Sequence, residues 1–392
     1  MDYKLASSTW DGKELAAIDN VVKSGMFSMG ENVKEFENDF SKFFGVKYSI
    51  MVNSGSSANL LAIASLFFRK KNPLKRGDEV IVPTVSWSTT YTPLQQYGLK
   101  LKFVDVNLKT LNYDLDKLKT AVSTETRLIV CVNLLGNPND FDSIKELCSN
   151  HEIDIFEDNC ESMGAKYKSQ FTGTIGKVGS FSTFFSHHIS TMEGGVITTN
   201  DEEIYHILLS LRAHGWTRNL PKNNLVCSIG NDKFNEAFRF VLPGYNVRPL
   251  EMSGAIGIEQ LKKLPNFIKI RRQNAQIYLE LFKNSDHFII QEEIEHSSWF
   301  GFSFILKNSN KTKRNDLVKY LSSCQIEVRP IVSGNFLNKE NLVLKHFDYT
   351  MHENINNSIH LHDNGLFVGN HHFDLKKELF YLKEKFDIFF SK

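Results

Sequence analysis

The sequence GSFSTFFSHHISTMEGGVITTN, residues 179–200, places two apolar runs on either side of an unusually polar turn. The run with three phenylalanines predicts one strand, and Val196 to Thr199 predict a second strand after a glycine pair. The turn between them carries several hydroxyls and two adjacent imidazoles, His187 and His188. Because buried polar groups need partners, we interpret this turn as a candidate functional site inside the fold.

Before this stretch, short β-rich runs alternate with helical runs, which predicts an α/β fold. We expect a mixed, mostly parallel sheet flanked by helices, with ligands bound at the carboxyl ends of its strands. The expected strands are 48–52, 79–83, 102–106, 127–132 and 154–157, and the expected helices are 56–69, 88–97, 114–121 and 139–150.

The remaining segments predict helices around this sheet and a smaller C-terminal α/β domain. The length favours two domains, and we expect a large one over 1–283 and a small one over 284–392. Further helices are expected at 12–24, 31–44, 201–213 and 249–264, and a separate helix follows with Arg271, Arg272 and Asn274. A long polar loop is expected at 215–245. The expected strands of the small domain are 298–306, 326–332 and 365–368.

The composition argues against several classes of partner. There are 46 basic and 45 acidic residues, so no bulk charge favours nucleic acid or an anionic membrane. Five cysteines without C-x-x-C spacing argue against a disulfide framework, a zinc site or an iron–sulfur cluster, and we expect no metal. No basic-then-apolar signal opens the sequence, so a cytoplasmic location is expected.

The segment NSGSSAN, residues 53–59, follows a predicted strand and opens a predicted helix. Free N–H groups at a helix start, together with hydroxyls and a glycine that permits close approach, suit a phosphate. A plain serine cap is the alternative interpretation. Gly55 and Ser56 are therefore candidate phosphate ligands.

Two further candidates follow predicted strands at the same edge of the sheet. Asp158 could face a ligand, or it could only cap a turn. Trp87 could stack on a flat ligand, or it could pack in the core or at an interface.

The turn around His187 resembles the cofactor-anchoring segment of the sugar aminotransferase family, pyridoxal-phosphate enzymes of fold type I. Members show S-F-x-x-x-K-N-x-x-x-x-E-G-G, in which the lysine binds the cofactor covalently. Here the same spacing puts His187 at the lysine position, and no lysine lies between Lys177 and Lys222. The segments HHISTMEGG, EDNCESMGA and RAHGWTRNLP resemble a histidine-bearing subgroup of that family, and the resemblance spans almost the whole chain.

The resemblance implies fold type I, with bound pyridoxal 5'-phosphate or pyridoxamine 5'-phosphate, and assigns roles to the candidates. It also implies a homodimer with shared active sites, in which Asn246 reaches the neighbouring subunit's cofactor phosphate, and a role for His188 in orienting its neighbour. The implied cofactor-binding residues are Gly55, Ser56 and Ser182 at the phosphate, Trp87 on the pyridine ring, Asp158 at the ring nitrogen and Glu161 near the 3-hydroxyl.

His214 and Arg218 lie at a glycine-containing bend and are candidate substrate residues. The planar guanidinium fork of arginine pairs with two oxygens of a diphosphate at once. A surface salt bridge is the alternative for any single arginine.

His187 is the candidate catalytic residue, with a structural histidine as the alternative. An imidazole, whose ordinary pKa is about 6.5, accepts a proton near neutral pH better than an ammonium near 10.4. Without the lysine, the cofactor would rest noncovalently as the pyridoxamine form. His187 would then remove a proton and help the sugar to lose its 3-hydroxyl.

The subgroup resemblance implies a lyase of dideoxysugar and O-antigen biosynthesis. Its expected reaction removes the 3-hydroxyl of GDP-4-keto-6-deoxy-D-mannose to give a 3,6-dideoxy-4-keto sugar, and L-glutamate restores the cofactor amine. The alternatives are a 3-dehydratase of another GDP-linked 4-keto sugar such as a 6-deoxyheptose, a nucleotide-sugar aminotransferase, or a binding protein that has lost catalysis.

Overall fold

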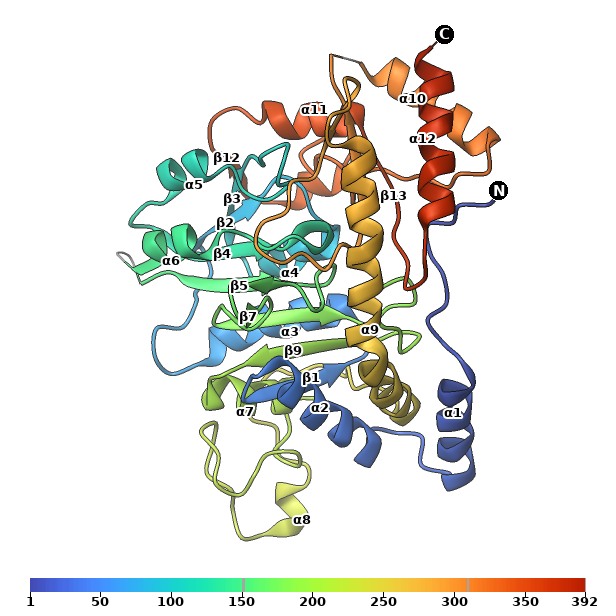
Figure 1. Ribbon diagram of the computed structural model, residues 1–392. Helices are drawn as coiled ribbons and strands as arrows, with labels where there is room; N and C mark the ends of the chain where they lie inside the picture. Colours follow the sequence, from blue (N-terminus) through green and yellow to red (C-terminus); the bar gives the residue numbers. More distant parts are fainter. Residues whose placement is uncertain (150–151, 309, 392) are drawn as a thin grey trace.

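The computed structural model describes residues 1–149, 152–308 and 310–391, and within them eight strands form one central sheet (Figure 1). Strand β9 runs antiparallel to both of its neighbours, whereas the other neighbouring pairs are parallel. This arrangement confirms the predicted fold class. In spatial order the strands are β1 (Tyr48–Val52), β9 (Gly195–Thr199), β8 (Val178–Ser182), β5 (Asp154–Asp158), β4 (Thr126–Val132), β2 (Glu79–Pro83), β3 (Lys100–Val104) and β12 (Tyr349–Met351).

Helices cover both faces of this sheet, because its strands are apolar on both sides. In β2, for example, Val80 and Val82 face one core cluster and Ile81 faces another, as the two-residue period of a strand requires. One face carries α3 (Gly55–Phe68), α4 (Ser88–Gln96) and α7 (Glu202–Leu211); the other carries α2 (Glu31–Phe44), α5 (Leu115–Ala121), α6 (Phe141–Ser149) and the first half of α9 (Glu251–Phe282).

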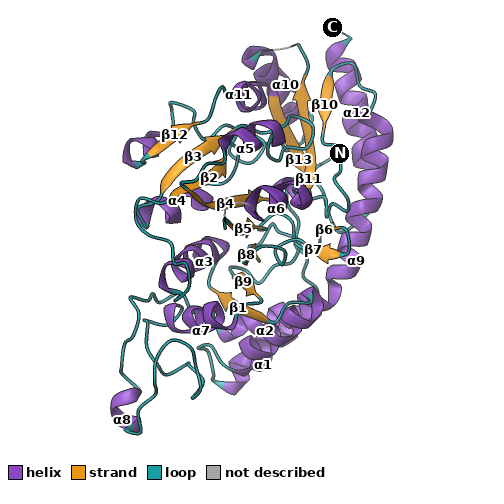
Figure 2. Cartoon of the chain, turned by 90° about the vertical axis from the view of Figure 1, so that its left-hand side faces the viewer, coloured by secondary structure: helices purple, strands orange, loops and turns teal. Residues whose placement is uncertain are grey.

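A smaller three-stranded sheet forms a second core with the C-terminal helices, beside the second half of α9 (Figures 1 and 2). The two cores do not divide at position 283. Tyr3, which precedes it, packs in the small core, and Phe336, which follows it, packs in the large core. The predicted boundary at 283/284 therefore stays a prediction. The remaining elements are β10 (Phe288–Ile290), β11 (Gly301–Leu306), β13 (Gly365–Gly369), α1 (Gly12–Ser24), α8 (Lys233–Glu236), α10 (Lys311–Ser323), α11 (Asn356–Asn364), α12 (Lys376–Phe390), β6 (Lys166–Tyr167) and β7 (Gln170–Phe171).

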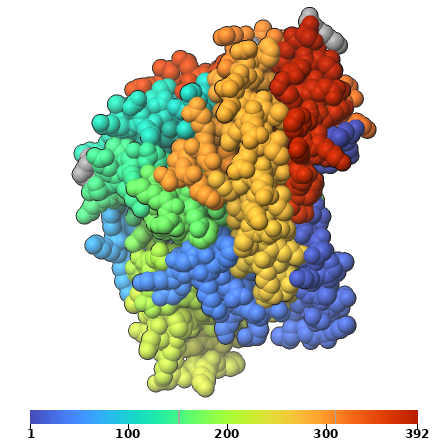
Figure 3. Space-filling model, in the orientation of Figure 1, coloured from blue at the N-terminus to red at the C-terminus, as the bar shows by residue number. Residues whose placement is uncertain are grey.

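The prediction of two successive helices after residue 249 was wrong, because α9 is one continuous helix of 32 residues with Pro265 inside it. Proline removes a single backbone hydrogen bond from the helix. Packing along the whole length offsets that loss, since α9 buries residues from Ser253 to Phe282 against both cores. Figure 3 shows α9 in gold, running between the red C-terminal region and the green middle of the chain.

The predicted strand at 326–332 was also wrong. Ile326 forms a single bridge with Tyr3, and Arg329 forms one with Phe367, but no ladder follows. The apolar pattern has another cause: Ile326 packs in the small core, whereas the end of the segment packs in the large one. The segment thus crosses between two cores, which its composition alone does not distinguish from a strand.

A buried carboxylate from α9 fixes the start of α2. Glu251 accepts hydrogen bonds from the backbone N–H groups of Gly30 (2.6 Å) and Asn32 (2.6 Å) and from the Asn32 side chain (2.8 Å). The helix has no side-chain cap of its own, so Glu251 supplies both the missing acceptors and a negative charge at the positive helix end.

We predict that Glu251→Ala lowers the free energy of unfolding by about 2–4 kcal/mol, because it leaves buried donors unsatisfied. Urea denaturation followed by circular dichroism measures this change. Glu259→Ala, on the same helix, removes a carboxylate that pairs only with Lys262, and it should cost less than about 1 kcal/mol. Equal losses in the two variants would contradict the capping role.

Candidate active site

A cavity of about 310 Å³ lies at the carboxyl ends of the central strands and collects most of the predicted residues. Strands β1, β4, β5 and β8 all end at this edge, so side chains from distant parts of the sequence converge there. The predicted site residues that line it are Gly55, Ser56, Trp87, Asp158, Glu161, Ser182 and His187. The lining residues that were not predicted include Asn59, Thr89, Cys160, Phe184, Ser186, Glu193, Phe300, Arg329 and Val332.

The start of α3 forms one wall and presents backbone N–H groups and hydroxyls. Ser54 caps the helix by accepting from the backbone N–H of Ser57 (3.1 Å), and the Ser56 hydroxyl lies 3.0 Å from that of Thr89. A side chain at Gly55 would lie 2.7 Å from Cβ of Ser182, so only glycine permits this close approach. The wall is suited to an anion such as phosphate.

Adjacent carboxylates at the end of β5 have different environments. Glu157 is fully buried and accepts from the backbone N–H groups of Gly173, Ile175 and Gly176 at 2.6–2.7 Å, so it holds the following loop. Burial raises the pKa of Glu157, although these hydrogen bonds oppose the rise. Glu157 is therefore structural.

Asp158, in contrast, faces the cavity from an almost dry position, with 5% of its surface exposed. It accepts from the Asn59 amide (2.9 Å) and the Thr90 hydroxyl (2.7 Å). Sequence reasoning missed both partners. Asn59 could have been found, because it lies four residues after Gly55 and therefore on the same face of α3.

Trp87 precedes α4 at the mouth of the cavity and keeps 55% of its surface exposed. Its flat ring is therefore available to a flat ligand. The interpretation as a core residue does not agree with this exposure.

His187 lies in the turn between β8 and β9, with its ring 5.3 Å from that of Phe300 and 5.9 Å from that of Phe184. Its Nδ1 has no hydrogen-bond partner within the described part of the chain. Burial, followed by the charges of Arg329 and Arg271, lowers the pKa of His187 to about 3. The imidazole is therefore neutral at pH 7, and in this environment it is a weaker base than an imidazole in water.

Hydrogen bonds inside the turn and to the C-terminal segment hold this geometry. The Thr183 and Thr191 hydroxyls lie 2.6 Å apart and close the turn. His188 is fully buried, and its Nε2 donates to the carbonyl of Ser298 (3.2 Å). His188 thus anchors the turn, and both imidazoles pack on Phe300, while its predicted role in orienting His187 stays a prediction.

Glu161 and Arg329 form the opposite lip of the cavity. Glu161 accepts from the backbone N–H of Leu135 (3.2 Å) and lies 3.8 Å from the guanidinium of Arg329. Burial raises the pKa of Glu161, and Arg329 opposes the rise. Arg329 and Phe300 come from the C-terminal half, where no sequence motif marked them.

His214, Arg218 and Asn246 lie outside this cavity, in a separate group around Trp216. The Arg218 guanidinium lies 4.3 Å from the centre of the Trp216 ring, and the His214 ring lies 5.0 Å from it. Asn246 is exposed and accepts from Arg248 (3.0 Å). One chain alone therefore does not bring these three residues to the candidate site, and their roles stay predictions.

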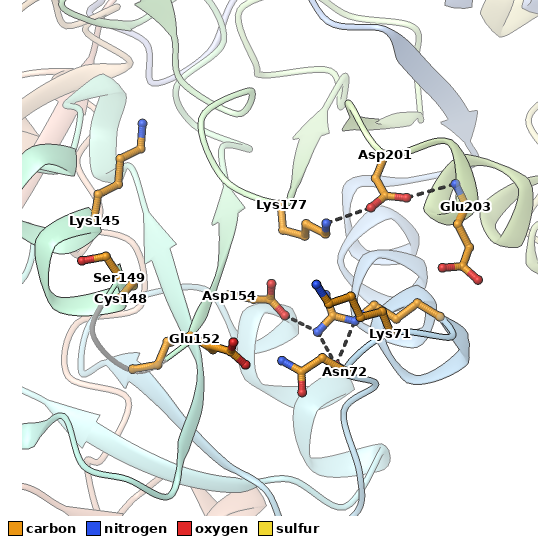
Figure 4. A pocket seen from close by; sticks show the side chains of 12 residues that line it. Lys71, Asn72, Lys145, Cys148, Ser149, Glu152, Asp154, Lys177, Asp201 and Glu203 are labelled. Atoms are coloured by element: carbon orange, nitrogen blue, oxygen red, sulfur yellow. Dashed lines mark hydrogen bonds and ion pairs between the residues drawn. The ribbon is translucent and has the colours of Figure 1, made fainter.

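A larger depression of about 470 Å³ lies at the opposite edge, where the parallel strands begin (Figure 4). Two of its charge pairs are Lys177 with Asp201 (2.8 Å) and Arg69 with Asp154. None of the predicted site residues lines it. The depression therefore does not compete with the cavity at the carboxyl edge as the candidate site.

Two further findings limit what the described residues can do. They contain no group of three or more His, Cys, Asp or Glu side chains that could hold a metal ion. Among the same residues, no helix is both long and apolar enough to cross a membrane.

A helix start suited to an anion, a buried carboxylate and an exposed aromatic ring at the carboxyl edge of a mixed sheet fit a pyridoxal-phosphate enzyme of the aminotransferase fold. The chain belongs to the DegT/DnrJ/EryC1/StrS aminotransferase family, whose model matches residues 9–371.

Relatives with high identity cover nearly the whole chain. The chain is 60% identical over 385 residues to GDP-4-keto-6-deoxy-D-mannose 3-dehydratase of Escherichia coli O55:H7, covering 98% of this chain and 99% of that enzyme. A crystal structure of GDP-4-keto-6-deoxymannose-3-dehydratase with a trapped PLP-glutamate geminal diamine has a TM-score of 0.96 at 60% identity, covering 98% of this chain and 100% of that one. A mutant of that enzyme with bound GDP-perosamine has a TM-score of 0.95 at 59% identity, with the same coverage.

The lowered pKa of His187 leads to a prediction about stability in acid. The unfolded chain takes up this proton near pH 6.5, whereas the folded protein takes it up only near pH 3. Stability present at pH 7 is therefore lost as the pH falls through this window, by about 2 kcal/mol at pH 5.

Urea unfolding of the wild type and of His187→Asn at pH 7.5 and pH 5.0 isolates this contribution, since the other histidines affect both proteins equally. The variant should lose about 2 kcal/mol less than the wild type. Equal acid losses would show that His187 titrates normally in the folded protein.

Proposed function

We propose that the protein is a pyridoxal/pyridoxamine-phosphate-dependent dehydratase that acts on GDP-4-keto-6-deoxy-D-mannose. It removes the 3-hydroxyl to give a 3,6-dideoxy-4-keto sugar of the O-antigen type, and L-glutamate restores the cofactor amine. The observation that carries this proposal is a neutral imidazole, His187, where the aminotransferases of the family keep a lysine. The 60% identity to a dehydratase of that name supports the same reaction.

The cavity fits the cofactor. The start of α3 and Ser182 form a wall suited to the phosphate, Gly55 leaves the space that a Cβ would fill, and the buried carboxylate of Asp158 would hold the ring nitrogen. Trp87 offers its open face to the ring and Glu161 lies near the 3-hydroxyl in this proposal. When bound, the group supplies an amine for the sugar's C4 carbonyl and a ring that accepts an electron pair.

Asp158 is nearly dry and is held in place by donors from Asn59, Thr90 and the backbone N–H of Cys160. A fixed negative charge keeps a facing ring nitrogen protonated, which strengthens electron withdrawal. The carboxylate therefore determines the electronics of the site, and Asn59 and Thr90 determine where the carboxylate points.

His187 moves the protons. It is neutral at pH 7, so it can accept a proton as a general base and afterwards donate it to the departing 3-hydroxyl. Its ring packs against Phe300 and has fewer rotatable bonds than a lysine, so it cannot follow the proton to a distant sugar carbon. This restriction favours loss of the hydroxyl over transfer of nitrogen to the sugar.

Product analysis separates dehydration from the other reactions. The dehydratase releases ammonia when it is incubated with the GDP-linked 4-keto sugar and glutamate, whereas an aminotransferase retains the nitrogen in its product. Comparison of the hexose with a 6-deoxyheptose analogue determines the sugar preference.

We predict that His187→Lys suppresses dehydration at least about 100-fold, because it removes the general base. It should also attach the cofactor covalently, seen as an absorption band that survives dialysis. His187→Asn is the matched control, which loses dehydration without gaining this band. Dehydration by the lysine variant at the wild-type rate would remove His187 from the mechanism.

We further propose a cytoplasmic homodimer with shared active sites. The segment 215–245 carries three aromatic side chains with at least 60% of their surface exposed: Phe234, Phe238 and Phe240. Asn246 follows this segment in the sequence, and the group around Trp216 borders it. None of these residues lines the cavity of its own chain. A second copy that covers the surface could receive Asn246 at its cofactor phosphate.

Co-expression of Asn246→Ala and Asp158→Ala tests the shared site. Each variant alone should have little activity. Random pairing of two subunits should restore about a quarter of wild-type activity, because each mixed dimer contains one intact site. No restoration would place Asn246 and Asp158 in the same subunit's site.

A further inference from the structure

The turn that carries His187 is held from outside at Ser190, three residues further along the chain. Ser190 is buried, and both of its backbone groups bind side chains from other elements. Its N–H donates to Oε1 of Gln260 (3.0 Å), and its carbonyl accepts from the indole N–H of Trp10 (2.9 Å). The turn is thus clamped between α9 and the segment before α1.

Gln260 is a fully buried amide at the centre of this clamp. Besides the N–H of Ser190, its Oε1 accepts from the Thr9 hydroxyl (2.7 Å). Its Nε2 donates to the Thr9 carbonyl (3.1 Å) and to the Glu14 carboxylate (2.8 Å). The oxygen faces two donors and the nitrogen faces two acceptors, so one orientation of the amide satisfies every contact. A buried network with all its members satisfied is rigid.

An ion pair fixes the segment that carries Trp10. Lys263 on α9 contacts Glu14 (2.6 Å) and Asp11 (2.9 Å) at the start of α1, where Asp11 is the helix cap. Helix α1 therefore packs beside the first half of α9 (Figure 1). Trp10 comes directly before this fixed helix start, so a fixed backbone carries its indole to Ser190.

The residues between His187 and Ser190 are also anchored, whereas His187 itself is not. His188 donates to the carbonyl of Ser298, and Ile189 packs in the core between α2 and α9. The Nδ1 of His187 has no hydrogen-bond partner among the described residues. A general base must stay within hydrogen-bond reach of the proton that it takes. The position of this ring therefore depends on the backbone of the turn.

We propose that Trp10 and Gln260, supported by Thr9, are positioning residues that hold the catalytic imidazole through the backbone of its turn. This inference rests on the proposed function, in which His187 moves the protons. None of the three positioning residues lines the active-site cavity or the smaller cavity beside it, so they act through the turn and not on a ligand. A lysine bound to the cofactor would tie the turn to its ligand, whereas a histidine leaves this task to the protein.

Trp10→Phe tests the clamp, because it removes the indole N–H and keeps an aromatic ring. It should lower the kcat of dehydration at least about tenfold, since small displacements of a catalytic group are costly. The KM for the sugar and the Kd for pyridoxamine 5'-phosphate should stay within about twofold. Nitrogen-15 NMR of the histidine-labelled, cofactor-free protein gives a readout without turnover, in which the His187 signal should shift or broaden.

Tyr278→Phe is the matched control. The Tyr278 hydroxyl donates to the backbone carbonyl of Ser303 (2.6 Å) in the small core, away from the turn. Both variants therefore lose one aromatic donor to a backbone carbonyl, and urea denaturation compares their stabilities. Tyr278→Phe should change neither the kcat nor the His187 signal.

A pair of substitutions at Thr9 tests the clamp from its other side. Thr9→Val keeps the shape but loses the donor to Gln260, so it should move the His187 signal and lower the kcat. Thr9→Ser keeps the hydroxyl and should restore both.

An unchanged His187 signal in both Trp10→Phe and Thr9→Val would overturn the positioning role. So would a changed signal with an unchanged kcat, or a loss of kcat explained by a raised Kd for the cofactor. The ammonia assay on the wild type tests the dehydratase function separately. A moved His187 signal in the variants, with no ammonia released by the wild type, would disprove that function and leave the clamp on His187 in place.

Discussion

The antiparallel strand β9 forces the chain to turn at the carboxyl edge of the sheet, and the active site depends on this constraint. Strand β8 ends at Ser182 and β9 begins at Gly195, so the intervening turn must lie over the same edge as Asp158. The buried hydroxyls of Thr183 and Thr191 pair with each other at the base of the turn, whereas Phe184, Phe185 and Met192 stay exposed. A rigid turn of this kind holds His187 against the cavity without a covalent link to any ligand.

The electrostatics of the site follow from burial and from the charges of two arginines. The oxygens of Asp158 accept hydrogen bonds from Asn59, from Thr90 and from the backbone N–H of Cys160. His187 stays neutral at pH 7 because burial and the charges of Arg329 and Arg271 lower its pKa to about 3.

Local patterns in the sequence were sufficient for most of the large sheet. Short β-rich runs that alternate with helical runs predicted β1 and β2 with their observed ends, and the motif spacing led to Gly55, Asp158 and His187. Contacts that cross between cores could not be predicted. Pro265 falsely indicated a helix end, and the apolar residues of 326–332 falsely indicated a strand, because long-range packing determines both segments.

Arg271, Arg329 and Phe300 show the same limit within the site. No motif surrounds them, and only the fold places them beside a turn that lies much earlier in the chain. Asn59 and Thr90 differ, because helical spacing from residues already singled out could have identified them. The predicted roles of His214, Arg218 and Asn246 depend on a second subunit, which a single sequence cannot position.

The central claim is that a neutral imidazole at position 187 acts where related enzymes use an amine. Nitrogen-15 NMR of the histidine-labelled protein, with His187→Asn used to assign the signal, measures this protonation state directly. We predict a neutral imidazole at both pH 7 and pH 5, since the pKa of His187 lies near 3. An imidazolium signal for His187 at pH 7 would contradict the account.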